Sequence, residues 1–391
     1  FLLASCAIPT SLANMSDEVD KLAAGDKEEE EEELDCSVPE VVNKYQFAGK
    51  VANAAIQKVA AECAVGKDVA ELCELGDSII NQELANVYKG KKIEKGIAFP
   101  TCVSLNNCCG HFSPLKEDSV QLKDGDVAKI DLGVQVDGYV ALVATTVVIG
   151  EVSGPAADAI MAAKSAAEVI IRCLKPGKKN SEITPLLERC VDAFGCKAVD
   201  GVVSHQIKRF TTEGTKVITN KNVPGHQVEE AAIEPHEAYA VDIVVSTGEG
   251  KCRELDTKCT VFKRAPDQKY NLKMKTAREA LFKIEKTHPK MPFSLREIDD
   301  TRVRLGITEC VRHELLQPHP VLYEKETEKV AQIKFTVLLM PSGPLKITGV
   351  DIPDTVKSDK QIEDEEIIEL LKQAVKKKKG KKDKKEGEEA K

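Results

Sequence analysis

The sequence predicts a mixed fold of the α/β (α+β) class, built around a sheet with two similar halves. Apolar residues recur at helical spacing in two segments near the start, 38–65 and 68–88. Strand-length apolar runs follow within 97–150. The third observation is an internal repeat. KIDLGVQVDGY (129–139) and AVDIVVSTGEGK (240–251) each place an aspartate on an apolar strand that leads into a glycine-bearing turn.

The expected elements follow in order along the chain. A break at Gly66 separates the first two helices, which are expected to cover the first half of the sheet. The dipeptide Asp-Gly, typical of hairpin turns, occurs at 124–125 and at 137–138. Helices are expected at about 154–174 and 181–195, because small or apolar residues form a stripe along each segment.

Length and composition restrict the class of protein. With 391 residues the chain can bury a large core, as two domains or as one unit with an insertion. The most apolar stretches, such as YVALVATTVVIG, reach only strand length, so we expect a soluble protein without a membrane span. Thirteen cysteines, an odd number without metal-finger spacing, favour reduced thiols in a cytosolic or nuclear protein.

The two ends of the chain differ from the body. Residues 1–14 lack a basic n-region and precede Met15, so we interpret them as an upstream extension and not as a signal peptide. An acidic run follows at Glu28–Glu33, and the whole segment 1–37 is expected to be disordered. After a body over 38–350, the segment 351–375 is predicted to carry an amphipathic helix over 361–375, with acids in its first turns. The lysine-rich tail, 376–391, is expected to stay disordered.

Four segments carry polar residues within apolar strands and loops. They are FPTCVSLNNCCGHFSP (99–114), VAKIDLGVQVDGYVALVATT (127–146), AYAVDIVVSTGEGK (238–251) and AQIKFTVLLMP (331–341). In order and spacing they resemble the substrate-pocket loop and three metal-ligand strands of type II methionine aminopeptidases. The resemblance implies the pita-bread fold, with a pseudo-two-fold repeat and a helical insertion at about 263–330.

The resemblance also implies where metal ligands would stand. A two-metal hydrolase needs several oxygen or imidazole ligands around two ions roughly 3.5–4 Å apart. In chain order, the ligand positions fall on Asp131, Leu142, Ser204 or, after a one-residue slip, His205, then Asp242 and Lys334. Only two of the four expected carboxylates are therefore present, and the leucine cannot coordinate a metal.

The lysine at position 334 argues against a bound metal ion. An ammonium about 4 Å from a divalent ion would cost roughly 8 kcal/mol at an effective dielectric near 20. We therefore hypothesise that the Lys334 ammonium lies between Asp131 and Asp242 and neutralises them, because buried charges persist only when paired. The inventory alone leaves open a residual site that adds His205 and the pocket histidine His111. No cofactor or metal is expected.

Three basic clusters stand out in a chain of net charge −8. They are KGKKIEK (89–95), the start of the insertion, where 263–304 holds twelve Lys/Arg against six Asp/Glu, and KKKKGKKDKK (376–385). One such cluster is often only a solvated face, but together they favour binding to RNA phosphates without base readout. On the insertion, an apolar stripe of Met274, Ala277, Leu281 and Ile284 is expected. The candidate RNA-binding residues are Lys89, Lys91, Lys92, Lys263, Arg264, Lys273, Lys275, Arg278, Lys283, Lys286, Lys376, Lys377, Lys378, Lys379, Lys381, Lys382, Lys384 and Lys385.

Further motifs narrow the resemblance. GIAFPT, HFSPLK, KIDLGV, YAVD, STGEG, KMKT, MPF, HELLQP, VLYEKE and FTVLLMP, spread over about 40–350, resemble the proliferation-associated (ErbB-receptor-binding) protein family. That resemblance implies a catalytically inactive aminopeptidase fold. It also implies binding to the large ribosomal subunit near the peptide-tunnel exit, through rRNA and tunnel-exit proteins, and roles in ribosome biogenesis and translation. A monomer in the cytoplasm, nucleus and nucleolus is expected.

Two other functions stay open from the sequence. One is an active metal-dependent methionine aminopeptidase with an unusual ligand set. The other is a module whose old pocket captures a peptide N-terminus, with Asp131 and Asp242 as counter-charges. This last hypothesis loses its basis if Lys334 already pairs with both carboxylates.

Overall fold

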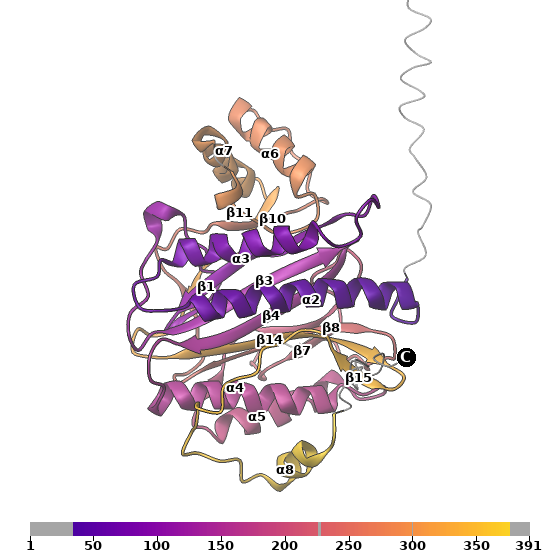
Figure 1. Ribbon diagram of the computed structural model, residues 1–391, viewed down its shortest axis with the longest axis vertical. Helices are drawn as coiled ribbons and strands as arrows, with labels where there is room; N and C mark the ends of the chain where they lie inside the picture. Colours follow the sequence, from indigo (N-terminus) through magenta and orange to yellow (C-terminus); the bar gives the residue numbers. More distant parts are fainter. Residues whose placement is uncertain (1–33, 226–227, 299, 376–391) are drawn as a thin grey trace, which may run out of the picture. The chain divides into compact units, whose positions relative to one another are not determined.

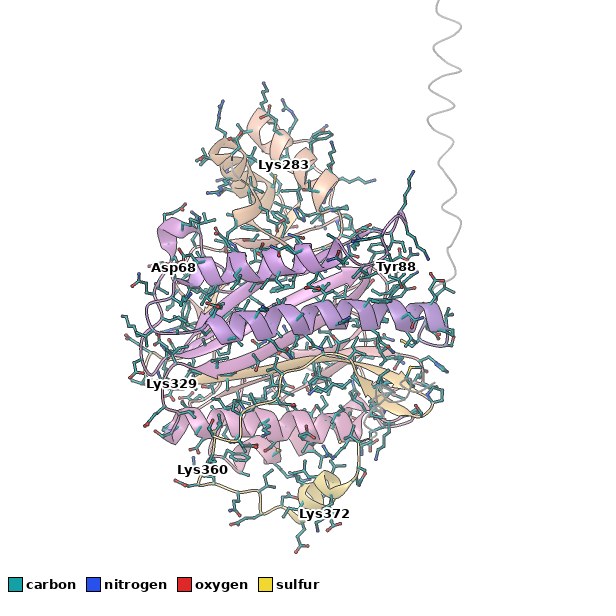
Figure 2. All side chains as sticks on the ribbon, in the orientation of Figure 1. Asp68, Tyr88, Lys283, Lys329, Lys360 and Lys372 are labelled. Atoms are coloured by element: carbon teal, nitrogen blue, oxygen red, sulfur yellow. A yellow bond between two sulfur atoms is a disulfide. The ribbon has the colours of Figure 1, made fainter. Side chains whose placement is uncertain are left out.

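Two long helices open the described part of the chain. The computed structural model describes residues 34–225, 228–298 and 300–375, so the predictions for the acidic run and the tail lysines lie outside it. Helix α2 (Pro39–Glu62) has a proline in its first turn, where a missing N–H is tolerated. Helix α3 (Val69–Leu84) begins after Asp68, whose carboxylate accepts hydrogen bonds from the first-turn amides (Figure 2).

A large antiparallel sheet lies beside these helices (Figure 1). Its strands are β1 (Lys95–Leu105), β3 (Val127–Val136), β4 (Tyr139–Val148), β5 (Lys197–Ala198), β6 (Val203–Ile207), β7 (Val217–Thr219), β8 (Ala238–Ser246), β14 (Val330–Met340) and β15 (Gly343–Lys346). They are ordered β1-β3-β4-β14-β8-β6-β7, with β15 beside β14 and β5 beside β8. Strands β4 and β14 therefore join the two halves that the repeat predicted.

The two Asp-Gly dipeptides behave differently. Asp137 and Gly138 join β3 to β4 with φ of 56° and 77°, the left-handed pair that a tight hairpin requires. Asp124-Gly125 forms a turn that leads into β3, and the Gly125 amide donates to Ile149 O at 2.7 Å. Hairpin geometry is thus found at the second site, whereas at the first the turn does not connect two paired strands.

Side chains of the sheet alternate between its two faces. Ile130 of β3 packs with α2 and α3. Val241 of β8 packs with α4 (Gly154–Cys173) and α5 (Thr184–Asp192). The aspartate next to each of these residues therefore points to the opposite face, away from these helices.

A separate layer of helices and short strands is inserted between β8 and β14, in the second half of the large sheet. It contains β10 (Val261–Arg264), α6 (Lys275–Thr287), β11 (Phe293–Ser294), η3 (Leu295–Glu297), α7 (Thr301–Arg312) and β12 (Leu316–Pro318). Figure 1 shows α6 beside α7, apart from the helices on the large sheet. The buried stripe of α6 is Ala277, Ala280 and Ile284. The predicted stripe is wrong at Met274, which precedes the helix as its N-cap and is 47% exposed.

Smaller elements complete the fold. A three-stranded sheet joins β2 (Cys108–Gly110), β13 (Leu322–Tyr323) and β9 (Arg253–Glu254) in that order. Short 3-10 turns are η1 (Lys116–Asp118) and η2 (Asn180–Glu182). The C-terminal helix α8 (Glu365–Lys372) is shorter than the 361–375 segment predicted from amphipathicity. None of the described helices has the length and apolar character needed to cross a bilayer.

The cysteines depart from expectation at one pair. Cys109 and Cys252 form a disulfide across 143 residues of sequence. The prediction of reduced thiols is therefore wrong for these two, while the other ten cysteines of the described ranges are free.

Candidate functional site

One row of residues crosses four strands of the large sheet. Asp131 of β3 pairs with Ala144 of β4, Ala144 pairs with Lys334 of β14, and Lys334 pairs with Asp242 of β8. Residues paired across adjacent strands present their side chains on the same face. The short Ala144 side chain lets Lys334 reach across β4, so a single row brings both aspartates to one lysine.

The lysine ammonium bridges the two carboxylates. Lys334 Nζ lies 2.5 Å from Asp131 Oδ2 and 3.0 Å from Asp242 Oδ2. The three side chains are only 12%, 7% and 14% exposed, respectively. This confirms the hypothesis that Lys334 lies between the aspartates. We call Lys334, Asp131 and Asp242 the ion triad.

Two further residues complete the surroundings of the ion triad. Gln332 Nε2 donates to Asp242 Oδ1 at 2.9 Å and to Asp131 Oδ2 at 3.5 Å. Lys334 Nζ lies 5.8 Å from the ring centroid of Phe99. The sequence analysis missed Gln332, although it stands two residues before Lys334 on β14 and therefore shares its face.

Electrostatics keeps the lysine charged. Burial by itself lowers the pKa of Lys334, but the two aspartate charges outweigh it and raise that pKa above its ordinary value. Burial raises the pKa of Asp131, and the Lys334 ammonium opposes this rise. Asp131 Oδ1 is buried and accepts no hydrogen bond from the described residues. The ion triad carries one excess negative charge when both aspartates are ionised, so its stability depends on the ammonium.

Leu142 occupies apolar surroundings next to the row. Its side chain is 7% exposed and belongs to an apolar cluster with Tyr139 and Ile207. A Cβ added at Gly133, the residue paired with it, would lie 2.5 Å from Leu142 Cδ2, so the glycine makes room for the leucine. The Leu142 amide donates to Thr336 Oγ1 at 2.8 Å.

The histidine position has two candidate residues with different contacts. Ser204 is fully buried, and its Oγ accepts a hydrogen bond from the Asp242 amide at 3.0 Å. His205 is half-buried, and its Nδ1 lies 3.4 Å from Gln206 O. Burial lowers the pKa of His205, and the nearby Lys334 ammonium lowers it further. Ser204 therefore supports the backbone of the ion triad, while His205 is a neutral neighbour.

A group of three aromatic rings lies beside the ion triad. His111, at φ 65°, has its Nδ1 3.1 Å from Pro320 O. The rings of His111, Phe99 and His319 lie 5.4–5.7 Å apart, centroid to centroid. Burial lowers the pKa of His111, and burial followed by the His111 charge lowers that of His319 to about 3. The sequence analysis did not single out His319, which joins His111 and Phe99 only in the folded chain.

The predicted RNA-binding residues separate into exposed and inward-turned groups. Lys263 Nζ donates to Thr212 Oγ1 at 3.0 Å, and Arg264 pairs with Glu285 at 2.9 Å, so both are engaged within the protein. Lys283 on α6 is half-buried; it and Lys372, on α8, lie at opposite ends of the view in Figure 2. The exposed candidates are Lys89, Lys91, Lys92, Lys273, Lys275, Arg278 and Lys286. Arg278 also donates hydrogen bonds to Leu272 O at 2.9 Å and to Lys273 O at 2.7 Å.

Comparison with known proteins now places this arrangement in a family. Residues 43–257 match the protein family described as "Metallopeptidase family M24". The chain belongs to this family. It is 49% identical over 329 residues to ErbB-3 binding protein 1 of Solanum tuberosum, covering 83% of this chain and 85% of that protein. It is 44% identical over 344 residues to proliferation-associated protein A of Dictyostelium discoideum, covering 86% and 89%.

The solved structures agree with this M24 assignment. A thermophilic Arx1 superposes with a TM-score of 0.80 at 28% identity, covering 87% of this chain and 100% of that one. The predicted pita-bread fold is therefore confirmed. So is the predicted membership in the methionine-aminopeptidase-like group that includes the ErbB-3 binding and proliferation-associated proteins.

Membership in a metallopeptidase family raises the question of a metal ion, and the donor set at the ion triad does not fit one. A divalent ion needs several ligands with free lone pairs, preferably anionic oxygens. Here Asp131 and Asp242 both turn toward an ammonium. Within the described ranges, no three His, Cys, Asp or Glu side chains are grouped to hold a metal ion.

Proposed function

We propose that this M24 family member is a non-catalytic factor that binds the large ribosomal subunit near its peptide-tunnel exit. In this proposal it acts in ribosome biogenesis and translation as a monomer, in the cytoplasm and in the nucleus and nucleolus. The observation that carries the non-catalytic part is the ion triad, because a Lys334 ammonium stands where hydrolysis would need metal ligands. In this interpretation Lys334, Leu142 and Ser204 have replaced a bridging glutamate, an aspartate and a histidine.

Exposed basic residues support the binding part of the proposal. Lys273, Lys275, Arg278 and Lys286 lie on or just before α6 and are exposed to solvent. Phe282, on the same helix, is 69% exposed. Lysine and arginine side chains neutralise phosphates and release counterions, which gives binding without base readout. The α6 surface, defined by these five residues, is therefore the part of the described chain best suited to rRNA.

Co-sedimentation with purified large ribosomal subunits tests the proposal. The full chain is compared with a chain that ends at Val375 and with a variant carrying Lys273→Glu, Lys275→Glu and Arg278→Glu. We expect saturable binding, weakened in both altered proteins. Loss of three phosphate contacts should make the slope of log K against log salt shallower by about 2.

A matched control separates a specific surface from net charge. Lys58 on α2, Lys123 in the turn before β3 and Lys357 are exposed lysines away from α6. Reversing these three changes the net charge by the same amount and should leave binding nearly unchanged. Absence of binding by the full chain at low salt, or equal weakening by the control, would contradict the proposal.

Two alternative functions, peptide capture and peptidase activity, stand differently against the ion triad. A module that captures a peptide N-terminus with Asp131 and Asp242 loses its basis, because Lys334 already pairs with both carboxylates. An active methionine aminopeptidase is tested by metal analysis together with turnover of a Met-Ala peptide. Turnover with stoichiometric bound metal would overturn the non-catalytic part of the proposal while leaving ribosome binding to its own test.

A further inference from the structure

A disulfide spans the small sheet at the base of the insertion. Cys109 lies in β2, Cys252 directly precedes β9, and the two sulfurs are bonded. Strand β13 lies between them, because Leu322 pairs with Gly110 on one side and with Glu254 on the other. The disulfide therefore links the two outer strands of this sheet across its central strand.

Two of the three strands, β9 and β13, are those through which the chain enters and leaves the insertion. Strand β9 is followed by β10, where the insertion begins, and β13 follows β12, where it ends. Strand β2 is followed by His111, whose Nδ1 contacts Pro320 O just before β13. The disulfide thus fastens the entry to the insertion onto the pocket loop of the body.

The two cysteines of the disulfide differ from each other in solvent exposure. Cys252 is half-buried, whereas Cys109 is 6% exposed. Free thiols such as Cys36 and Cys190 are buried, and burial raises the pKa of each to about 12. A thiol that is buried and protonated reacts slowly, so thiol chemistry should concentrate where a sulfur can be reached. Cys252 is the reachable end of the disulfide.

We propose that Cys109–Cys252 is a reversible thiol–disulfide exchange site that fastens and releases the base of the insertion. The thiolate of a dithiol reductant attacks Sγ of Cys252, the S–S bond breaks, and Cys109 leaves as a thiolate that takes up a proton. The second thiol of the reductant then attacks the mixed disulfide and frees Cys252 as a thiol. Two electrons and two protons pass to the protein, and the reductant leaves as a disulfide.

The test uses the full chain equilibrated with glutathione disulfide, as the oxidised buffer, or with reduced dithiothreitol, as the reduced buffer. Native alkylation with non-reducing peptide mapping reports the disulfide, and amide hydrogen exchange reports the opening of β9 and β13. In oxidised buffer we expect a crosslinked 109–252 peptide. In reduced buffer we expect Cys252 to become alkylated and amide exchange in β9 and β13 to become severalfold faster, because the amides of these strands lose a covalent restraint.

Two variants complete the test. Cys252→Ser should show the fast exchange in both buffers, and Cys63→Ser, which removes a half-buried free thiol at the end of α2, should behave as the unaltered chain. A missing 109–252 peptide in oxidised buffer, a disulfide that resists native reduction, or equal exchange in both buffers would each overturn the proposal. These readouts use the isolated protein, so failure of ribosome binding would not affect them.

Discussion

Replacing Lys334 by methionine should destabilise the fold strongly, because it removes the only cation of the ion triad. The Lys334 ammonium lies 2.5 Å and 3.0 Å from two carboxylate oxygens. At an effective dielectric near 20, each contact corresponds to about 6 kcal/mol of Coulomb attraction, much of which offsets the cost of burying the charges. Removing one partner of a buried pair costs about 3–5 kcal/mol, and we expect a loss of that size at pH 7.

Urea unfolding, followed by circular dichroism, measures the loss. The deficit of Lys334→Met should shrink as pH falls below 6. The two carboxylates left without a cation repel each other, which raises the pKa of one of them in the folded state. A carboxyl whose folded pKa lies above its unfolded pKa gains stability as pH falls through the folded value.

A triple variant provides the control. Lys334→Met combined with Asp131→Asn and Asp242→Asn removes all three charges of the ion triad, and should recover most of the lost free energy of unfolding. If the single variant unfolds within 1 kcal/mol of the unaltered chain, roughly the worth of an ordinary exposed ion pair, the account of the ion triad is refuted.

The other predictions concern the same centre, the insertion and one buried lysine. Lys334→Glu alone should not produce peptidase activity on Met-Ala peptides, because Leu142 still supplies no ligand; turnover by this variant would mean that the ligand positions are misassigned. Arg296→Met breaks a buried ion pair with Asp77, at 2.5 Å, that ties η3 to α3, and should cost about 3–5 kcal/mol and expose the insertion to limited proteolysis; an unchanged digest would contradict this. Burial lowers the pKa of Lys129 to about 7, so Lys129→Met should raise the melting temperature most below pH 7, where the unaltered chain buries a charge. The gain should fade toward pH 10, because the lysine of the unfolded chain then also loses its proton; equal gains at pH 6 and 10 would refute it.

Sequence reasoning succeeded where one residue determines the chemistry. The resemblance to metal-ligand strands placed Lys334 at one site with Asp131 and Asp242, and a buried cation must be paired with anions, so their ion pairs could be predicted. The hairpin at Asp137-Gly138 was predictable for a similar reason, because few residues accept its left-handed backbone.

Other features depended on contacts between distant segments. Gln332 joins the ion triad only because β14 lies between β4 and β8. Lys263 and Arg264 are not available as free basic residues, because the fold places Thr212 and Glu285 beside them. The Cys109–Cys252 disulfide joins residues 143 positions apart, and no spacing rule connects them. Met274 was misplaced because its helix begins one residue later than the apolar pattern indicated.

In the row Asp131–Ala144–Lys334–Asp242, the charges of the two carboxylates are balanced by a side chain, and this balance does not depend on the supply of metal ions. A bound ion stabilises a fold by an amount that rises with its free concentration, so chelation or starvation weakens such a protein. Here the counter-charge is covalently part of the chain, and its effective concentration at the carboxylates does not change with the medium. The two halves of the sheet are thus held together by a cation that cannot be exchanged, chelated or competed away.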